Sequence, residues 1–354
     1  ESLMLPSTPE HPGVAMPPAS ERLAFAMKLQ QYTGPVHAKG VEDTAFYRYN
    51  ALTSLNEVGG DPQRGALTAD EFHETNLRRV REWPREMVAT ATHDTKRGED
   101  HRARLNVLSE YPDEWRVALG QWMRINAQHR TIIAGRPAPS RNDEYLFYQA
   151  LVGAWPAEVE APRHVPAGLR HRLSAFMVKA VREAKTHSSW VNPNDAYERA
   201  VGVFVDGVLA SHTTPRFLSA LAPLLQPVAA AGVLNSLAQL TLKIAAPGVA
   251  DFYQGVESWD LSLVDPDNRG VVDFEQRHAR LRELLPSVHA AAASAEGPEA
   301  ATPAAFVADL LEHWPDARIK AYVTACGLRL RRTHPDLCVL GDYVPLRADD
   351  VGED

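Results

Sequence analysis

A short apolar run that ends in a histidine and an aspartate limits what this chain can fold into. Residues Met87 to Thr92 have the length and the small or β-branched side chains of a buried strand, and His93 and Asp94 follow directly. In a closed parallel barrel, residues at the carboxyl ends of the strands face the mouth of the active site. The position of His93 and Asp94 therefore suits catalysis, although a histidine followed by an aspartate can equally be a hydrogen-bonded pair that anchors a loop.

Two other segments have the pattern of short strands. Pro35 to Gly40 is a short run that ends on glycine, like a buried strand leading into a loop, and Ala246 to Gly255 reads as another short strand with its loop. The apolar residues of Glu21 to Gln31 predict a short helix that breaks at Gly34 and Pro35. Residues 1–20 contain five prolines and predict a loop or linker.

After Asp94 the pattern is helical for well over a hundred residues. Trp115, Ala118, Leu119 and Trp122 recur at helical spacing, so the two tryptophans are predicted core residues. The predicted helices start at Pro112, run from Asn142 to Trp155 and from Leu169 to Lys185, start at Asn192–Asp195, and run from Pro215 to Ile244 with an interruption near Pro227. The alanine-rich stretch 290–305 predicts a connection or a frayed helix.

Length and charge narrow the class of protein. The 354 residues suffice for two or three domains, and 37 basic against 45 acidic residues give a net charge of −8, which disfavours nucleic acid as a partner. We see no membrane-spanning run and no signal peptide, and Cys326 and Cys338 have no metal-type spacing, so we expect a cytoplasmic protein with free thiols and no membrane partner. Because the chain opens on Glu1, we also expect an upstream segment to be missing.

Five blocks of sequence resemble one family of enzymes. The blocks are Ala38 to Tyr49, Ser54 to Pro62, Ala91 to Asp100, Ser189 to Asn194 and Tyr253 to Arg269. In this order and over most of the chain they are similar to the maltooligosyl trehalose synthases of the α-amylase family, and they separate that family from ordinary amylases.

The resemblance implies an α/β fold: the later part of a (β/α)8 TIM barrel with a large α-helical insertion, mostly helical and truncated before a C-terminal β domain. Residues 1–94 would hold late barrel strands and helices, and 95–228 the helical insertion. Residues 229–335 would hold the last barrel strand and the helices after it, and 336–354 the start of the β domain.

The resemblance also implies a reaction. The family converts the reducing-end α-1,4 linkage of a maltooligosaccharide into an α,α-1,1 linkage, in trehalose biosynthesis, with a retaining mechanism and no cofactor. An aspartate is the nucleophile and a glutamate the acid/base, and a further aspartate preceded by histidine stabilises the positively charged sugar. That last pair corresponds to Asp94 and His93.

The nucleophile and the acid/base have no counterpart in this sequence. The amylase-type strand with an arginine two residues before the nucleophilic aspartate is not found, nor is the next strand's glutamate. Both normally precede the histidine–aspartate pair. We therefore expect this chain to be inactive alone and to need the missing amino-terminal half of the barrel as a partner.

Candidate substrate-binding residues follow the three predicted strands. Polar and aromatic groups there can bind the hydroxyls of a maltooligosaccharide and stack on its rings: Lys39, Glu42, Asp43, Tyr47, Arg48, Lys96, Arg97, Gln254, Glu257, Asp260, Asp265, Asp267, Asn268 and Arg269. The alternatives are an ion network of Glu42, Asp43 and Arg48, a solvated helix start at Lys96 and Arg97, and a core role for Trp259. No histidine spacing predicts a metal site.

Two other functions stay open at this point. The same carboxylates would serve an ordinary α-glucan hydrolase or transglycosidase, whereas a mutase needs a closed, dry site, for which the helical insertion could act as a lid. The chain could also be a non-catalytic carbohydrate-binding half of a split enzyme.

Overall fold

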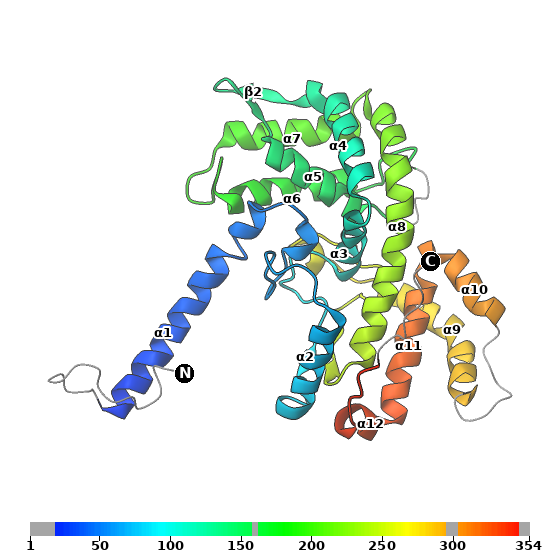
Figure 1. Cartoon of the computed structure of the whole chain (residues 1–354). Helices are drawn as coiled ribbons and strands as arrows, with labels where there is room; N and C mark the ends of the chain where they lie inside the picture. The colour runs from blue at the N-terminus through cyan, green and yellow to red at the C-terminus, as the bar shows by residue number, and fades with distance from the viewer. Residues whose placement is uncertain (1–17, 158–161, 295–303, 347–354) are drawn as a thin grey trace.

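The protein is mostly helical along the part of the chain that the structure describes. The computed structural model describes residues 18–157, 162–294 and 304–346. Helices α4 to α7 stack at one end, α8 runs the length of the molecule, and α9 to α12 lie along its other end (Figure 1). The residues expected to form a proline-rich linker lie almost entirely outside the described residues, as do 295–303 of the alanine-rich stretch.

The element bounds are as follows. The helices are α1 Ala19–Gly40, α2 Ala69–Glu82, α3 Glu99–Asn106, α4 Pro112–Asn126, α5 Arg141–Ala154, α6 Leu169–Ala184, α7 Asp195–Ala210, α8 Thr214–Ala245, α9 Phe274–Ser294, α10 Ala304–Glu312, α11 Arg318–Thr333 and α12 Pro335–Leu340. The strands are β1 Met87–Val88, β2 Thr131–Ile133, β3 Arg136–Ala138 and β4 Val249–Ala250.

Strands β1 and β4 lie side by side although they are far apart in sequence. They pair in parallel, with Met87 opposite Val249 and Val88 opposite Ala250. The two predicted strands that precede His93 and Gln254 are thereby confirmed in part: each is a strand over only two residues, and Ala89 to Thr92 are not strand. Their carboxyl ends point the same way. Residues that follow them meet at one edge of the sheet.

The main hydrophobic core lies among α3 to α8. Trp122, Phe147, Tyr148, Phe204 and Phe217 are all fully buried, and the rings of Trp122 and Tyr148 are 5.5 Å apart. Ring pairs at this distance pack edge to face or tilted, which adds to the stabilisation from burial. Together with the burial of Trp115, this arrangement confirms the predicted core role of both α4 tryptophans.

Helix starts follow the capping chemistry of the sequence. The Ser140 side chain caps α5 by accepting from the Asp143 N–H, and Asn194 caps α7 by accepting from the Tyr197 N–H. Thr68 and Glu71 form a reciprocal capping box on α2. The caps lie close to the predicted starts, although for α7 the cap is Asn194 and not Asn192.

The strand predicted at Pro35 to Gly40 is wrong. These residues form the last turns of α1, which runs through Gly34 and Pro35 without the predicted break and projects away from the other helices (Figure 1). A strand needs a neighbour to satisfy its backbone groups, and among the described residues no strand pairs with this segment. The backbone instead forms bonds within the helix, and most of its side chains are exposed.

Two predictions further along the chain also need correction. Helix α8 is continuous through Pro223 and Pro227, because burial of Leu224, Leu225 and Val228 outweighs the cost of a proline inside a helix. The described part of the segment expected to begin a β domain contains the short helix α12 and no strand. Residues 347–354 lie outside the described residues.

Helix α8 has the length and apolar composition of a membrane span, although we expected no such segment. Its most apolar 18-residue window has a mean hydropathy of 1.7, and 44% of that window is buried. The helix packs against α3, α4 and α11, as core helices of many proteins do. Length and composition alone are therefore weak evidence for a span.

Candidate active site

The loop that carries His93 and Asp94 connects the sheet to α3. It leaves the carboxyl end of β1 and forms a tight turn, in which the Thr95 hydroxyl donates to the Thr92 carbonyl at 2.9 Å and the Asp94 N–H donates to the Thr92 hydroxyl at 3.2 Å. The side chains of His93 and Asp94 point outward from this turn, and that of Asp94 is 54% exposed. The turn thus presents a carboxylate and an imidazole on an open surface.

Asn268 and Arg269 hold this loop by its carbonyl groups. The buried Asn268 amide lies 3.2 Å from the His93 carbonyl and 3.4 Å from those of Thr92 and Thr95. Arg269 Nε donates to the His93 carbonyl at 3.0 Å, and its Nη2 lies 3.9 Å from Asp94 Oδ1. The loop after β4 therefore fixes the loop after β1 and places a guanidinium beside the Asp94 carboxylate.

Asp43 lies between two lysines on the other side of the loop. Its carboxylate accepts from Lys96 at 2.8 Å and from Lys39 at 2.5 Å. Burial raises the pKa of Asp43, but the two lysine hydrogen bonds outweigh this and hold the pKa below its usual value. Asp43 is thus a fixed anion that anchors Lys96.

Lys96 and Arg97 are buried, with 5% and 2% of their surface exposed. The alternative of a solvated helix start is therefore wrong. Burial lowers the pKa of Arg97, and the nearby side chains of Tyr47 and Glu57 offset part of this decrease. Arg97 Nη1 lies 3.5 Å from the Asn56 carbonyl, so its contacts here are with the protein interior.

Two predicted carboxylates are paired with basic residues of α6. Asp265 accepts from Lys179 at 2.6 Å, and Asp267 accepts from Arg172 through both oxygens at 2.8 and 2.9 Å. Asp267 also accepts from the Leu263 N–H at 2.7 Å. These bonds tie the loop after β4 to the helical region.

The predicted residues near the end of α1 are dispersed. The Glu42 carboxylate accepts from the Gly59 N–H at 3.1 Å, and Arg48 Nε donates to the Ala184 carbonyl at 2.5 Å. Tyr47 is buried, which raises the pKa of its phenol. Glu42, Asp43 and Arg48 do not join in one ion network, since each has a different partner.

The remaining predicted residues also follow β4. Glu257 pairs with Arg277 at 2.5 Å, Asp260 accepts from the Ser262 hydroxyl at 2.6 Å, and Gln254 is exposed. Trp259 donates to the Trp314 carbonyl at 2.8 Å and packs against the smaller hydrophobic core of α9 to α11. Trp259 is therefore partly buried against this core.

Sequence reasoning missed the residues that support the site from elsewhere. Glu57 binds the loop after Asp94, Lys179 and Arg172 pair with the loop after β4, and Lys320 binds the start of α3. The one available signal was that Glu57 lies in a block carrying the family resemblance. The lysines and the arginine are ordinary helix residues until tertiary contacts are known.

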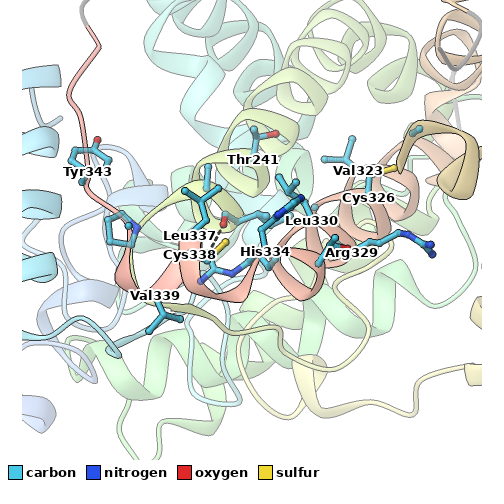
Figure 2. Close-up of a pocket in the computed structure, with 18 of the residues that line it drawn as sticks. Thr241, Val323, Cys326, Arg329, Leu330, His334, Leu337, Cys338, Val339 and Tyr343 are labelled. Carbon is cyan, nitrogen blue, oxygen red and sulfur yellow. Dashed lines mark hydrogen bonds between the residues drawn. The ribbon is translucent and has the colours of Figure 1, made fainter. Parts of the chain in front are cut away.

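Two cavities are lined by neither His93 nor Asp94. One, of about 1040 Å³, is bounded mainly by apolar residues of α8, α11 and α12, and both free cysteines line it (Figure 2). It contains none of the predicted site residues. A smaller polar cavity of about 310 Å³ is lined by Asp260 and Asp267 together with Arg172 and Trp259.

Metal ligands do not gather in the part of the chain that the structure describes. No group of three or more histidine, cysteine, aspartate or glutamate side chains there has the arrangement to hold an ion. The chemistry available around Asp94 is that of a carboxylate, an imidazole and a guanidinium. Such a set can bind sugar hydroxyls and stabilise developing positive charge.

Comparison of sequences identifies relatives along nearly the whole chain. A protein of Mycobacterium tuberculosis strain H37Rv assigned as a maltooligosyl trehalose synthase is 41% identical over 327 residues, which is 91% of this chain. The chain spans about 36% of that relative's length. No family model matches the chain.

Solved structures of trehalose-forming synthases are also similar to this chain. A crystal structure of a maltooligosyl trehalose synthase is 35% identical with a TM-score of 0.73, over 90% of this chain and 39% of that one. The maltooligosyltrehalose synthase of Arthrobacter ramosus is 38% identical with a TM-score of 0.68, over 88% of this chain and 35% of that one. A glycosyltrehalose synthase is 35% identical with a TM-score of 0.69.

Proposed function

The chain belongs to the maltooligosyl trehalose synthase family, and on that premise we propose that it supplies one wall of the active site of a (1→4)-α-D-glucan 1-α-D-glucosylmutase. The substrate would be a maltooligosaccharide, and the product would end in a trehalose unit. β1 and β4 would be neighbouring strands of a (β/α)8 barrel. The enzyme would act in the cytoplasm without a cofactor or a membrane.

One observation carries the proposal. The exposed Asp94 carboxylate and His93 imidazole follow β1 at the edge where β4 also ends, on a loop fixed by Asn268 and Arg269. Asp94 would accept hydrogen bonds from two sugar hydroxyls that strengthen as the ring flattens and gains positive charge. His93 would donate to the same sugar.

The bond-breaking groups would come from outside these 354 residues. A retaining mechanism needs a nucleophile and an acid/base about 5 Å apart on opposite sides of the scissile bond. Acidic residues around the Asp94 loop already have partners: Asp43 binds two lysines, Asp265 binds Lys179, and Glu57 accepts from the Lys96 and Arg97 amides. We therefore propose that the chain is inactive until an amino-terminal polypeptide completes the barrel.

A mixing experiment tests this function. Maltopentaose is incubated with the chain alone, and with the chain plus a separately produced amino-terminal part of a family member, while reducing ends and free glucose are followed. The proposal predicts loss of reducing ends without release of glucose, and only in the mixture. Glucose release would favour a hydrolase, oligosaccharide binding without turnover would favour a carbohydrate-binding half, and turnover by the chain alone would refute the missing nucleophile.

A further inference from the structure

The amide groups just after Asp94 donate to a single, partly buried carboxylate, that of Glu57. The Lys96 N–H donates to Glu57 Oε1 at 2.7 Å and the Arg97 N–H donates to Glu57 Oε2 at 3.2 Å. The Arg102 guanidinium donates to Oε2 at 2.9 Å, so the charge of Glu57 is compensated. The Glu57 side chain is only 16% exposed, which keeps water from competing for these bonds.

We propose that Glu57 is the positioning residue that sets the Asp94 loop for catalysis, an inference that rests on the function proposed above. Asn268 and Arg269 bind the carbonyl groups of the loop, whereas Glu57 binds its amide groups from another segment. The backbone around Asp94 is thus held through both its acceptors and its donors. Neither set of bonds uses the carboxylate of Asp94 itself.

The same carboxylate also aligns Lys96. With its backbone N–H on Glu57, Lys96 extends its ammonium group to Asp43 at 2.8 Å. Charge-assisted bonds of this kind are the stronger hydrogen bonds in proteins. Loss of Glu57 would therefore loosen both the path of the loop and the direction of the Lys96 side chain.

Hydrogen exchange on the full chain tests the contact without any need for activity. In Glu57→Gln, an amide nitrogen replaces one acceptor oxygen, so one loop amide loses its partner. We expect exchange in peptides covering residues 92–98 to rise about tenfold, with unchanged exchange in α5. Unchanged exchange in 92–98 would overturn the proposal. The control is Asp61→Asn, in which an exposed carboxylate that accepts from the Gln63 N–H in the same segment is neutralised.

Turnover by the mixture of the two polypeptides tests the consequence for catalysis. We expect Glu57→Gln to lower kcat about 10- to 100-fold with KM little changed, because misplacement of a catalytic group slows the chemical step. Asp61→Asn should leave both constants unchanged. In a background that already carries Asp94→Asn, Glu57→Gln should cause no further loss. An equal loss in both backgrounds would contradict action through Asp94.

The exchange and turnover experiments distinguish failure of the proposed function from failure of the proposed role of Glu57. If the wild-type mixture makes no non-reducing product, the proposed function fails, while the exchange arm still decides whether Glu57 holds the loop. Should Glu57→Gln unfold, Glu57→Asp replaces it, because its shorter carboxylate cannot reach both amides. The same increase in exchange, confined to residues 92–98, is then expected, and its absence would again overturn the proposal.

Discussion

The ammonium group of Lys320 on α11 lies 2.7 Å from the carboxylate of Glu99, the first residue of α3, and both side chains are almost fully buried. Lys320 also donates to Asp100 at 2.6 Å. Burial opposes the charge on Glu99, but Lys320 and Lys243 outweigh it and lower the pKa of Glu99 to about 2. A buried ion pair thus ties the helix that follows Asp94 to the far end of the molecule.

Removal of Lys320 should destabilise the fold strongly. Lys320→Met leaves two buried carboxylates without their main cation, and we expect a loss of about 3–5 kcal/mol in the free energy of unfolding, measured with urea. The control is Arg170→Met, which breaks the exposed pair of Arg170 with Asp206 and should cost less than about 1 kcal/mol. Similar losses in the two variants would contradict this account.

The buried His101 should make the protein sensitive to acid. Burial, followed by the nearby arginines Arg97 and Arg104, holds the pKa of His101 well below its ordinary 6.5. Below about pH 6.5 the unfolded chain therefore binds a proton that the folded chain does not, and stability falls as pH falls. As pH falls below about 6.5, the free energy of unfolding of the wild type should decrease, relative to that of His101→Gln, by up to about 1.4 kcal/mol per pH unit.

An exposed histidine supplies the control for that pH profile. A backbone hydrogen bond to Asp309, helped by the charge of that residue, raises the pKa of His313. Its contribution to stability is therefore present at low pH and lost as pH rises, so His313→Gln should change the profile in the opposite direction. A His101→Gln profile parallel to that of the wild type would contradict the assignment of a neutral buried imidazole.

Gly153 should be intolerant of a side chain. A Cβ at this position of α5 would overlap Nε2 of His101, so Gly153→Ala must displace the ring or the helix. We expect a loss of about 1–3 kcal/mol in thermal or urea unfolding. At Gly120 on α4 nothing lies within 4 Å, and Gly120→Ala should stabilise by up to about 1 kcal/mol. If Gly153→Ala and Gly120→Ala changed the stability in the same direction, the close approach of α5 to His101 would be contradicted.

The helical half of the fold was predictable because its signals are local. The spacing of Trp115 and Trp122 is read from a few neighbouring residues. The helix starts predicted at Asn142 and Asn192 lie two residues from the observed caps, Ser140 and Asn194. The short strands β1 and β4 were found as apolar runs, and their pairing follows from the geometry of parallel sheets. Pro35 to Gly40 has the same kind of run, but no strand among the described residues pairs with it, and it forms helix.

The supporting residues of the site were harder to predict because their partners are distant in sequence. Lys320 lies on α11, far from Glu99, and Glu57 lies in a separate loop from the amides that it binds. Asn268 and Arg269 were expected to touch substrate, and the structure shows them bound to the backbone of the Asp94 loop. Whether they also contact sugar stays a prediction.

Asp94→Asn tests the central proposal most directly. The change keeps the shape of the side chain but removes the charge that would stabilise the sugar cation, and the exposed carboxylate contributes little to the fold. In the mixture with the amino-terminal part, we predict that kcat on maltopentaose falls by about a hundredfold or more, with an unchanged urea unfolding curve. Turnover close to that of the wild type would contradict the assignment of this loop to the active site.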